Sequence, residues 1–164
     1  MVHMVLATDM AKHAQHVNQL ESFVEEAHAS PHEDHETDEQ HKLETKTFLL
    51  EMLLHAADIS NSAKPQHIML RWTERVMTEL WNQGDQEESL GLPLSPLCNR
   101  AMDSLVVPKG QVGFITFVVQ PLFSPLAELI EEVKEATEHL EKNKAFWLQK
   151  DREGATFADC FHAS

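Results

Sequence analysis

Residues 111–123 read QVGFITFVVQPLF, and the fold class depends on whether this stretch is a strand or a helix. Its β-branched and aromatic residues would suit a buried β-strand by propensity alone. No other segment of the chain reads as a strand, however, and a lone strand cannot satisfy its backbone N–H and C=O groups. We therefore predict a helix here and an all-α fold for the chain.

Helical periodicity on both sides of this stretch agrees with that choice. Apolar residues at spacings of three and four predict further helices at about residues 2–27, 43–57, 65–88 and 125–149. The helix over 65–88 has an apolar residue at every fourth position, which predicts one apolar face made of Ile68, Trp72, Val76 and Leu80. The sequence contains no repeated unit that would indicate a solenoid.

A polar segment at about residues 30–42 separates the first two predicted helices and includes the sequence HEDHETDEQH. Nothing in it can support burial, so we expect a solvated loop. Four histidines lie between His28 and His41 among carboxylates, which would permit a helical metal-binding protein that uses this loop. Ordering such a segment costs conformational entropy, and an acidic low-complexity stretch is the simpler interpretation.

Composition limits the classes of function. The chain has 164 residues, 42% of them hydrophobic, and no continuous run of about 18 apolar residues, which indicates one soluble domain with one core and no membrane span. A net charge of -14 repels phosphate backbones and anionic lipids, so nucleic acid is not expected as a partner. With only Cys98 and Cys160 and no secretory leader, we expect a cytoplasmic protein.

Four sequence blocks are harder to explain by packing alone. They read MVLATDMAKH at 4–13, HAADISN at 55–61, QGDQEESLGLPLSPLCNR at 83–100 and KGQVGFITFVVQPLF at 109–123. In this order and with these residues the chain resembles the C-terminal part of the catalytic domain of class I 3',5'-cyclic-nucleotide phosphodiesterases. The resemblance implies the compact multi-helix (HD-type) fold of that domain and a polypeptide of which residues 1–164 are one part.

The resemblance also implies a reaction. Family members in cyclic-nucleotide signalling hydrolyse the 3' phosphoester of a cyclic nucleotide, cAMP or cGMP, to a 5'-nucleoside monophosphate. They use a hydroxide held between two divalent metals, usually zinc and magnesium or manganese, which lower the pKa of water and clamp the phosphoryl oxygens. Asn61 favours cAMP only weakly, because it is common in adenine-preferring members without being confined to them.

Seven residues match positions with known roles in the family. Asp58 matches a metal-ligating aspartate, Gln111 matches the glutamine whose amide pairs with the purine edge, and Phe114 matches the aromatic residue that stacks on the base. The other matches line or back the base pocket or lie near the metals: Asn61, Trp72, Val76 and Met10. Plain core packing explains Trp72, Val76 and Phe114 about equally well. The family does not use His55 as a ligand, so we interpret it as a packed or hydrogen-bonded histidine.

The sequence departs from the family pattern in the metal site. It contains neither an HN-x-x-H block nor an HD pair, which in the family supply the other ligands and the general acid. Asp58 alone leaves zinc three protein ligands short of a tetrahedral site. We therefore expect no catalytic residue and no turnover in this chain by itself, and self-association through the faces that the missing half would cover.

Two departures affect the base pocket. Ser62 stands where the family usually has proline, which predicts a looser turn after Asp58 because proline would fix φ. Met69 stands where many members have tyrosine, so a phenol hydrogen bond would be lost. A non-catalytic helical interaction module derived from a phosphodiesterase therefore stays open as an alternative to a fragment of an active enzyme.

Overall fold

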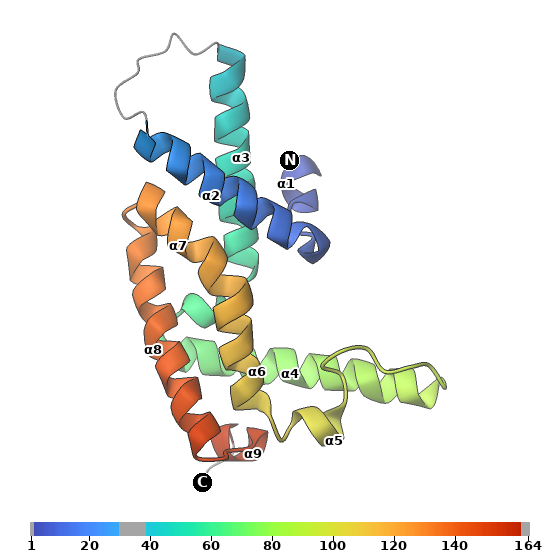
Figure 1. Cartoon of the computed structure of the whole chain (residues 1–164). Coiled ribbons are helices and arrows are strands. Elements are labelled where there is room, and N and C mark those ends of the chain that lie inside the picture. The colour runs from blue at the N-terminus through green and yellow to red at the C-terminus, as the bar shows by residue number, and fades with distance from the viewer. Residues whose placement is uncertain (1, 30–38, 162–164) are drawn as a thin grey trace. The chain divides into compact units, whose positions relative to one another are not determined.

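The structure is a computed structural model that describes residues 2–29 and 39–161. Within these ranges every regular element is helical, which confirms the predicted all-α class (Figure 1). The larger elements are α2 (His13–Ala29), α3 (Glu39–Asp58), α4 (Gln66–Ser89), α6 (Val107–Phe114), α7 (Gln120–Leu129) and α8 (Val133–Arg152). The short ones are α1 (Val2–Leu6), η1 (Met10–Lys12), η2 (Ser60–Ala63), α5 (Arg100–Asp103), η3 (Ile115–Val119) and α9 (Phe157–Phe161).

The stretch that could have been a strand is helical throughout. It runs from α6 through η3, which is π-helical, into α7. The wider turns of η3 end two residues before Pro121, which has no N–H to donate to the carbonyl four residues earlier. Tertiary packing therefore overrides the β propensity of these residues.

By length and mean hydropathy, residues Val107–Leu129 could also cross a membrane, since this stretch has 23 residues and a mean hydropathy of 1.5. The central helix of a water-soluble core meets the same criteria. Here Ile115, Val119, Leu122 and Leu126 are fully buried by other parts of the chain. The same stretch also leaves Phe117 78% exposed, so burial inside the protein explains part of its apolar composition.

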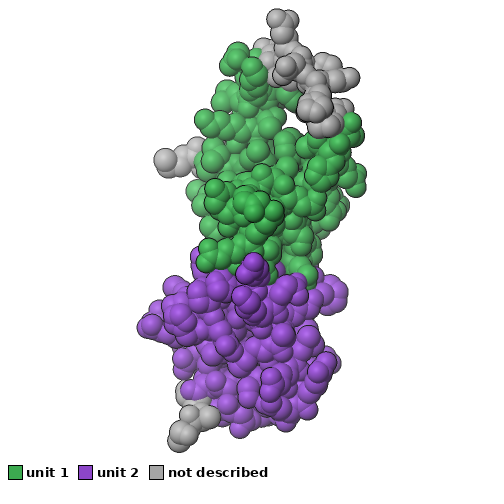
Figure 2. Space-filling view, turned by 90° about the vertical axis from the view of Figure 1, so that its left-hand side faces the viewer, with its two compact units in different colours: residues 1–60, 118–137 green, residues 61–117, 138–164 purple. Residues whose placement is uncertain are grey.

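Two compact units divide the chain, whereas its length predicted a single core (Figure 2). Unit 1 contains residues 1–60 and 118–137, and unit 2 contains residues 61–117 and 138–164. Each unit therefore combines two separate stretches of sequence. That both belong to one partial catalytic domain remains a prediction.

In unit 1, α2 and α3 pack with α7, and the short N-terminal α1 packs with α3. Phe23 on α2 and Phe48 on α3 contact each other, with ring centroids 6.2 Å apart. Buried residues come from α2, α3 and α7, and Ala7 is buried directly after α1; they are Ala7, Val17, Leu20, Val24, Met52, Ala56, Leu122 and Leu126. The helix predicted over 43–57 thus buries Met52 and Ala56 as part of α3.

In unit 2, α4 packs with the beginning of α6 and with the C-terminal α9. Met77, Trp81 and Val107 form a buried cluster. The Trp81 and Phe157 rings meet edge to face, with centroids 4.7 Å apart. The Phe157 backbone N–H donates to the Ser104 carbonyl at 2.8 Å. No periodic pattern predicted α9, because an element of five residues is too short to show one.

Two predicted helices are interrupted. The helix expected over 2–27 breaks before η1, where Asp9 caps the chain by accepting from the Ala11 N–H at 3.0 Å. The helix expected over 125–149 breaks after α7, where Ile130 takes an extended conformation with φ -133°. The loop expected at about 30–42 is shorter at its end, because α3 already begins at Glu39. Its residues 30–38 lie outside the described part of the chain.

The apolar face predicted for α4 is not the face that the protein buries. Apart from Gly84 near the end of the helix, the buried positions are Met69, Thr73, Met77 and Trp81, each one residue beyond the predicted stripe. Successive residues lie about 100° apart around a helix, so the predicted stripe points to one side of the buried one. Trp72 is 48% exposed and Val76 is 41% exposed. The prediction was wrong because the two neighbouring stripes are both apolar.

We expect the 164-residue chain to self-associate through these exposed apolar side chains. Large contiguous apolar surfaces are seldom left uncovered on soluble monomers, and α3 also exposes Leu43, Leu50 and Leu54. Light scattering should show a concentration-dependent mass above that of a monomer. Glutamine at both Trp72 and Val76 should shift the distribution toward monomer. Glutamine at the exposed polar positions Arg71 and Glu79 should not. A monodisperse wild-type monomer at all concentrations would contradict this expectation.

Candidate functional site

Asp58, the predicted metal ligand, is the last residue of α3 and is exposed. Its carboxylate has no hydrogen bond or ion pair to any residue in the described part of the chain. The chain continues directly into η2, where Asn61 is half-buried. Asp58 is therefore a free carboxylate that could supply one ligand to a cation.

Gln111 and Phe114 lie on the same side of α6, because residues three apart in a helix are neighbours. Both side chains are half-buried. The Oε1 atom of Gln111 is buried and accepts no hydrogen bond from the described residues. Other buried atoms of the described residues, such as Nε1 of Trp81 and Trp147, also lack a partner, but on Gln111 a ligand could supply the missing donor.

Trp72 and Val76 do not belong to the core of the structure. Both lie on exposed positions of α4, so plain core packing is the wrong interpretation for these two residues. The guanidinium of Arg75 lies 5.5 Å from the centre of the Trp72 ring. Met10 opens η1 and is 48% exposed. These apolar side chains are available for contacts that the described residues do not make.

The predicted site residues divide between the two units. Met10 and Asp58 belong to unit 1, and the five base-side residues Asn61, Trp72, Val76, Gln111 and Phe114 belong to unit 2. Among the residues that the structure describes, no group of three or more His, Cys, Asp or Glu side chains is arranged to hold a metal ion. One carboxylate fits a metal only as a single ligand of several.

A buried histidine pair next to this region was not predicted as a pair. Nδ1 of His13 and Nε2 of His55 lie 2.9 Å apart, so one ring donates a hydrogen bond to the other. His16 packs nearby, with its ring centre 6.0 Å from that of His55. The prediction that His55 is a packed or hydrogen-bonded histidine is confirmed, and it is both. Its partner is 42 residues away, and no pattern in a single sequence identifies such a pairing.

Burial lowers the pKa of both His13 and His55, because it disfavours the charged imidazolium. The neighbouring His16 lowers both pKa values further, and His13 lowers that of His55. A hydrogen bond with the Val118 backbone raises the pKa of His13, and the Asp58 carboxylate raises that of His55, but neither effect outweighs burial. Both side chains are therefore neutral in the folded chain at neutral pH.

We expect the folded chain to lose stability as the pH falls below about 6.5, the ordinary histidine pKa. The unfolded chain then binds protons that the buried pair binds only at lower pH, and this favours unfolding. Urea unfolding at pH 7.5 and pH 5.5 measures the effect. Glutamine at both His13 and His55 should reduce the pH dependence, while glutamine at the exposed His67 should leave it unchanged. If the free energy of unfolding fell by the same amount between pH 7.5 and pH 5.5 in the unsubstituted chain and in both variants, this account would be refuted.

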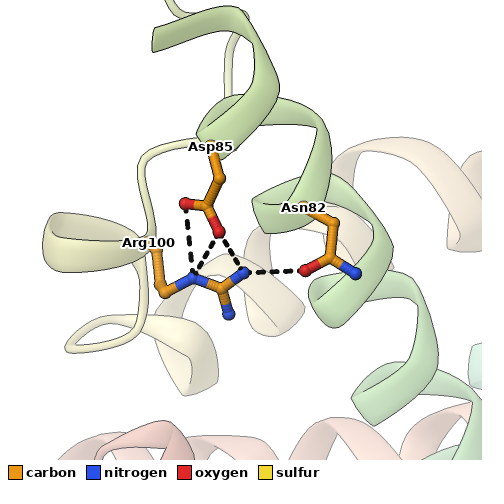
Figure 3. A network of polar contacts seen from close by, with 3 residues as sticks. All are labelled: Asn82, Asp85 and Arg100. Carbon is orange, nitrogen blue, oxygen red and sulfur yellow. Dashed lines mark hydrogen bonds and ion pairs between the residues drawn. The ribbon is translucent and has the colours of Figure 1, made fainter. Parts of the chain in front are cut away.

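In the block QGDQEESLGLPLSPLCNR, at 83–100, polar contacts join the loop after α4 to that helix. The Arg100 guanidinium donates to Asp85 at 2.6 Å and to the Asn82 side-chain oxygen at 2.8 Å (Figure 3). Further along the loop, the Glu87 carboxylate accepts from the Ser95 N–H at 2.7 Å and from its hydroxyl at 2.6 Å. These two bonds hold the pKa of Glu87 below its usual value. These contacts between α4 and the loop therefore account for the polar residues of this block.

Comparisons with known proteins agree with the sequence blocks. The family model of 3'5'-cyclic nucleotide phosphodiesterases matches residues 1–140. The chain is 37% identical to a Caenorhabditis elegans protein named "Probable 3',5'-cyclic-AMP phosphodiesterase pde-4", over 90% of this chain and 21% of that protein. It is 39% identical to the "Dual specificity calcium/calmodulin-dependent 3',5'-cyclic nucleotide phosphodiesterase 1B" of Bos taurus, over 83% of this chain and 22% of that one.

A solved structure is similar over nearly the whole chain. The phosphodiesterase domain of the RhoPDE fusion protein from Salpingoeca rosetta superposes with a TM-score of 0.76 at 27% identity, covering 92% of this chain and 45% of that domain chain. The chain spans about a fifth of the length of the curated relatives it matches (21% and 22%). The shared fold is therefore that of part of a phosphodiesterase domain.

Proposed function

Because the chain belongs to the 3',5'-cyclic nucleotide phosphodiesterase family, we propose that it forms the base-recognising side of a domain that hydrolyses cyclic nucleotides to 5'-nucleoside monophosphates. The observation that carries this proposal is the buried Oε1 atom of Gln111, which lacks a donor among the described residues. Gln111 lies one helical turn before Phe114. A purine offers both the missing hydrogen bond and a flat face for the aromatic ring.

The chemistry of these two side chains suits a purine. A glutamine amide both donates and accepts, so it can pair with the edge of adenine or guanine. Phe114 would stack on the base in an offset arrangement. The exposed Trp72 and Val76, together with Asn61, supply apolar and polar surface for the walls of the pocket. Both cAMP and cGMP fit this description.

Two divalent metals, zinc and magnesium or manganese, would complete the site. When bound, such ions lower the pKa of an attacking water and stabilise charge on the phosphoryl oxygens. The free carboxylate of Asp58 would be one of their ligands. Since zinc takes about four ligands, the remaining ones have to come from outside residues 1–164. We therefore propose that the chain by itself does not turn over substrate.

Gln111→Ala tests base recognition in the complete domain, meaning a polypeptide in which the preceding half of the catalytic domain is joined to residue 1. Removing the amide should raise KM by about 2-fold to 150-fold, which corresponds to a lost hydrogen bond or a stranded buried polar group. Steady-state kinetics on cAMP and cGMP would show kcat little changed, because the metal site is intact.

Gln15→Ala is the matched control, since Gln15 is an exposed glutamine on α2. It should leave both kcat and KM unchanged. An equal loss of kcat at constant KM in Gln111→Ala would assign Gln111 a different role. Nucleotide binding without any turnover by the complete domain would favour a non-catalytic binding module instead.

A further inference from the structure

Asn143 on α8 joins two backbone carbonyls that lie far earlier in the sequence. Its Nδ2 atom donates to the Ser62 carbonyl at 2.8 Å and to the Lys64 carbonyl at 2.7 Å, across 81 and 79 residues. Asn143 is only 1% exposed. All three residues belong to unit 2. The amide therefore forms a buried link between α8 and the connection from η2 to α4.

An asparagine amide is well suited to this position. Its NH₂ group has two hydrogens, and both are used by the two carbonyls. Asn143 itself is held by its helix, because Leu140 and Trp147, three residues before it and four after it, are also buried on the same side of α8. Without the amide, the two carbonyls would lose their donor, and the bond to the Ser62 carbonyl is buried, where an unpaired polar group is costly.

The linked carbonyls belong to the turn that carries a predicted pocket residue. Ser62 follows Asn61 directly within η2, and Asp58 lies four residues earlier. Ser62 replaces the family's usual proline, and the sequence therefore predicted a loose turn. In the structure Ser62 is fully buried and its carbonyl is bound by Asn143, whereas its own hydroxyl is buried without a partner among the described residues. Hydrogen bonds hold the turn where proline would have restricted φ.

We propose that Asn143 is a positioning residue of the nucleotide site, which fixes the backbone of η2 and thereby the orientation of the Asn61 side chain. The role of Asn61 in this statement rests on the proposed function, whereas the link to the turn does not. Asn143 lies beyond residue 140, where the match to the family model ends. No sequence block that identifies the family includes it.

The first test measures the turn itself in the 164-residue chain by amide hydrogen exchange. Asn143→Asp keeps the size of the side chain but removes both donors, and Asn143→Leu removes them without adding charge. Both variants should exchange at least about 10-fold faster at residues 59–64, with α2 unchanged. Asn18→Asp, at an exposed asparagine on α2, is the matched control and should not alter residues 59–64.

Unchanged exchange at residues 59–64 would overturn the proposal. Uniformly faster exchange in all helices of both variants would overturn it as well, because Asn143 would then serve general stability. Faster exchange confined to the turn supports it.

The second test uses the complete domain and asks whether Asn143 acts through Asn61. Asn143→Asp should raise KM about 10-fold with kcat little changed. In a domain that already contains Asn61→Ala, the same substitution should have almost no further effect, because residues acting through one another are non-additive. Additive effects, or equal losses of kcat and kcat/KM, would overturn the positioning role.

If the unsubstituted complete domain neither bound nor hydrolysed cyclic nucleotides, the proposed function and the role of Asn61 would fail. The hydrogen-exchange result would still decide whether Asn143 holds the turn.

Discussion

Gly84→Ala is expected to destabilise the chain severely. A Cβ atom at position 84 would lie 1.8 Å from the carbonyl oxygen of Cys98 and 2.8 Å from its carbonyl carbon. Both are backbone atoms, so no side-chain rotation relieves the overlap. The loop after α4 would have to separate from the helix and expose the buried Cys98. We expect a loss of about 3–5 kcal/mol in the free energy of unfolding, at the upper end for single substitutions.

Gly113→Ala is the matched control, because it adds the same methyl group to a helix where nothing lies within 4 Å of the new Cβ. Alanine is the better helix former, so this variant should be stabilised by about 0.5–1 kcal/mol. Thermal or urea unfolding of the three proteins makes the comparison. Equal stabilities for Gly84→Ala and the unsubstituted chain would mean that α4 and the loop do not approach as the structure describes.

The close approach at Gly84 explains why the block at 83–100 needs its particular residues. Glycine lets the loop touch α4, the Asp85 and Arg100 pair fastens its end, and Glu87 holds its middle through Ser95. The same loop places Leu97 at φ 67°, a left-handed conformation that costs a non-glycine residue energy. These polar contacts offset that cost. The block identified the family in the sequence, but only the structure shows that it fastens a loop.

The sequence was sufficient for the fold class and for most helices, because periodic burial is a local signal. The helices over 43–57 and 65–88 appear as α3 and α4 with ends shifted by a few residues at most. The buried face of α4 could not be deduced, since stripes one residue apart are both apolar. Choosing between them requires knowing which elements pack against α4, and that is a tertiary fact.

The residues that hold the site are harder to predict than the residues that belong to it. The family blocks contained five of the seven predicted site residues, all but Trp72 and Val76, although the roles of these residues remain predictions. The supporting pairs are His13 with His55 and Asn143 with the turn after Asn61, separated by 42 and about 80 residues. Each such pair is a hydrogen bond between distant parts of the chain. A single sequence carries no periodic or local trace of such a bond.

Asp58→Ala is expected to abolish turnover by the complete domain, lowering kcat by at least about 1,000-fold. Asp58 is a free, exposed carboxylate at the end of α3, so its removal should cost little stability. Turnover would be lost because the metal site lacks a ligand, and the metal content of the purified domain should fall together with the activity. Base binding should persist, because Gln111 and Phe114 lie on α6 and are untouched.

The comparison with Gln111→Ala separates chemistry from recognition. Asp58→Ala should lower kcat and leave the affinity for a cyclic nucleotide nearly unchanged, whereas Gln111→Ala should raise KM and leave kcat nearly unchanged. Asp151→Ala, at an exposed aspartate on α8, is the matched control and should change neither. A fully active Asp58→Ala domain with normal metal content would overturn the assignment of Asp58. Because Asp58 is the one metal ligand proposed within residues 1–164, the catalytic role of this chain would then rest on base recognition alone.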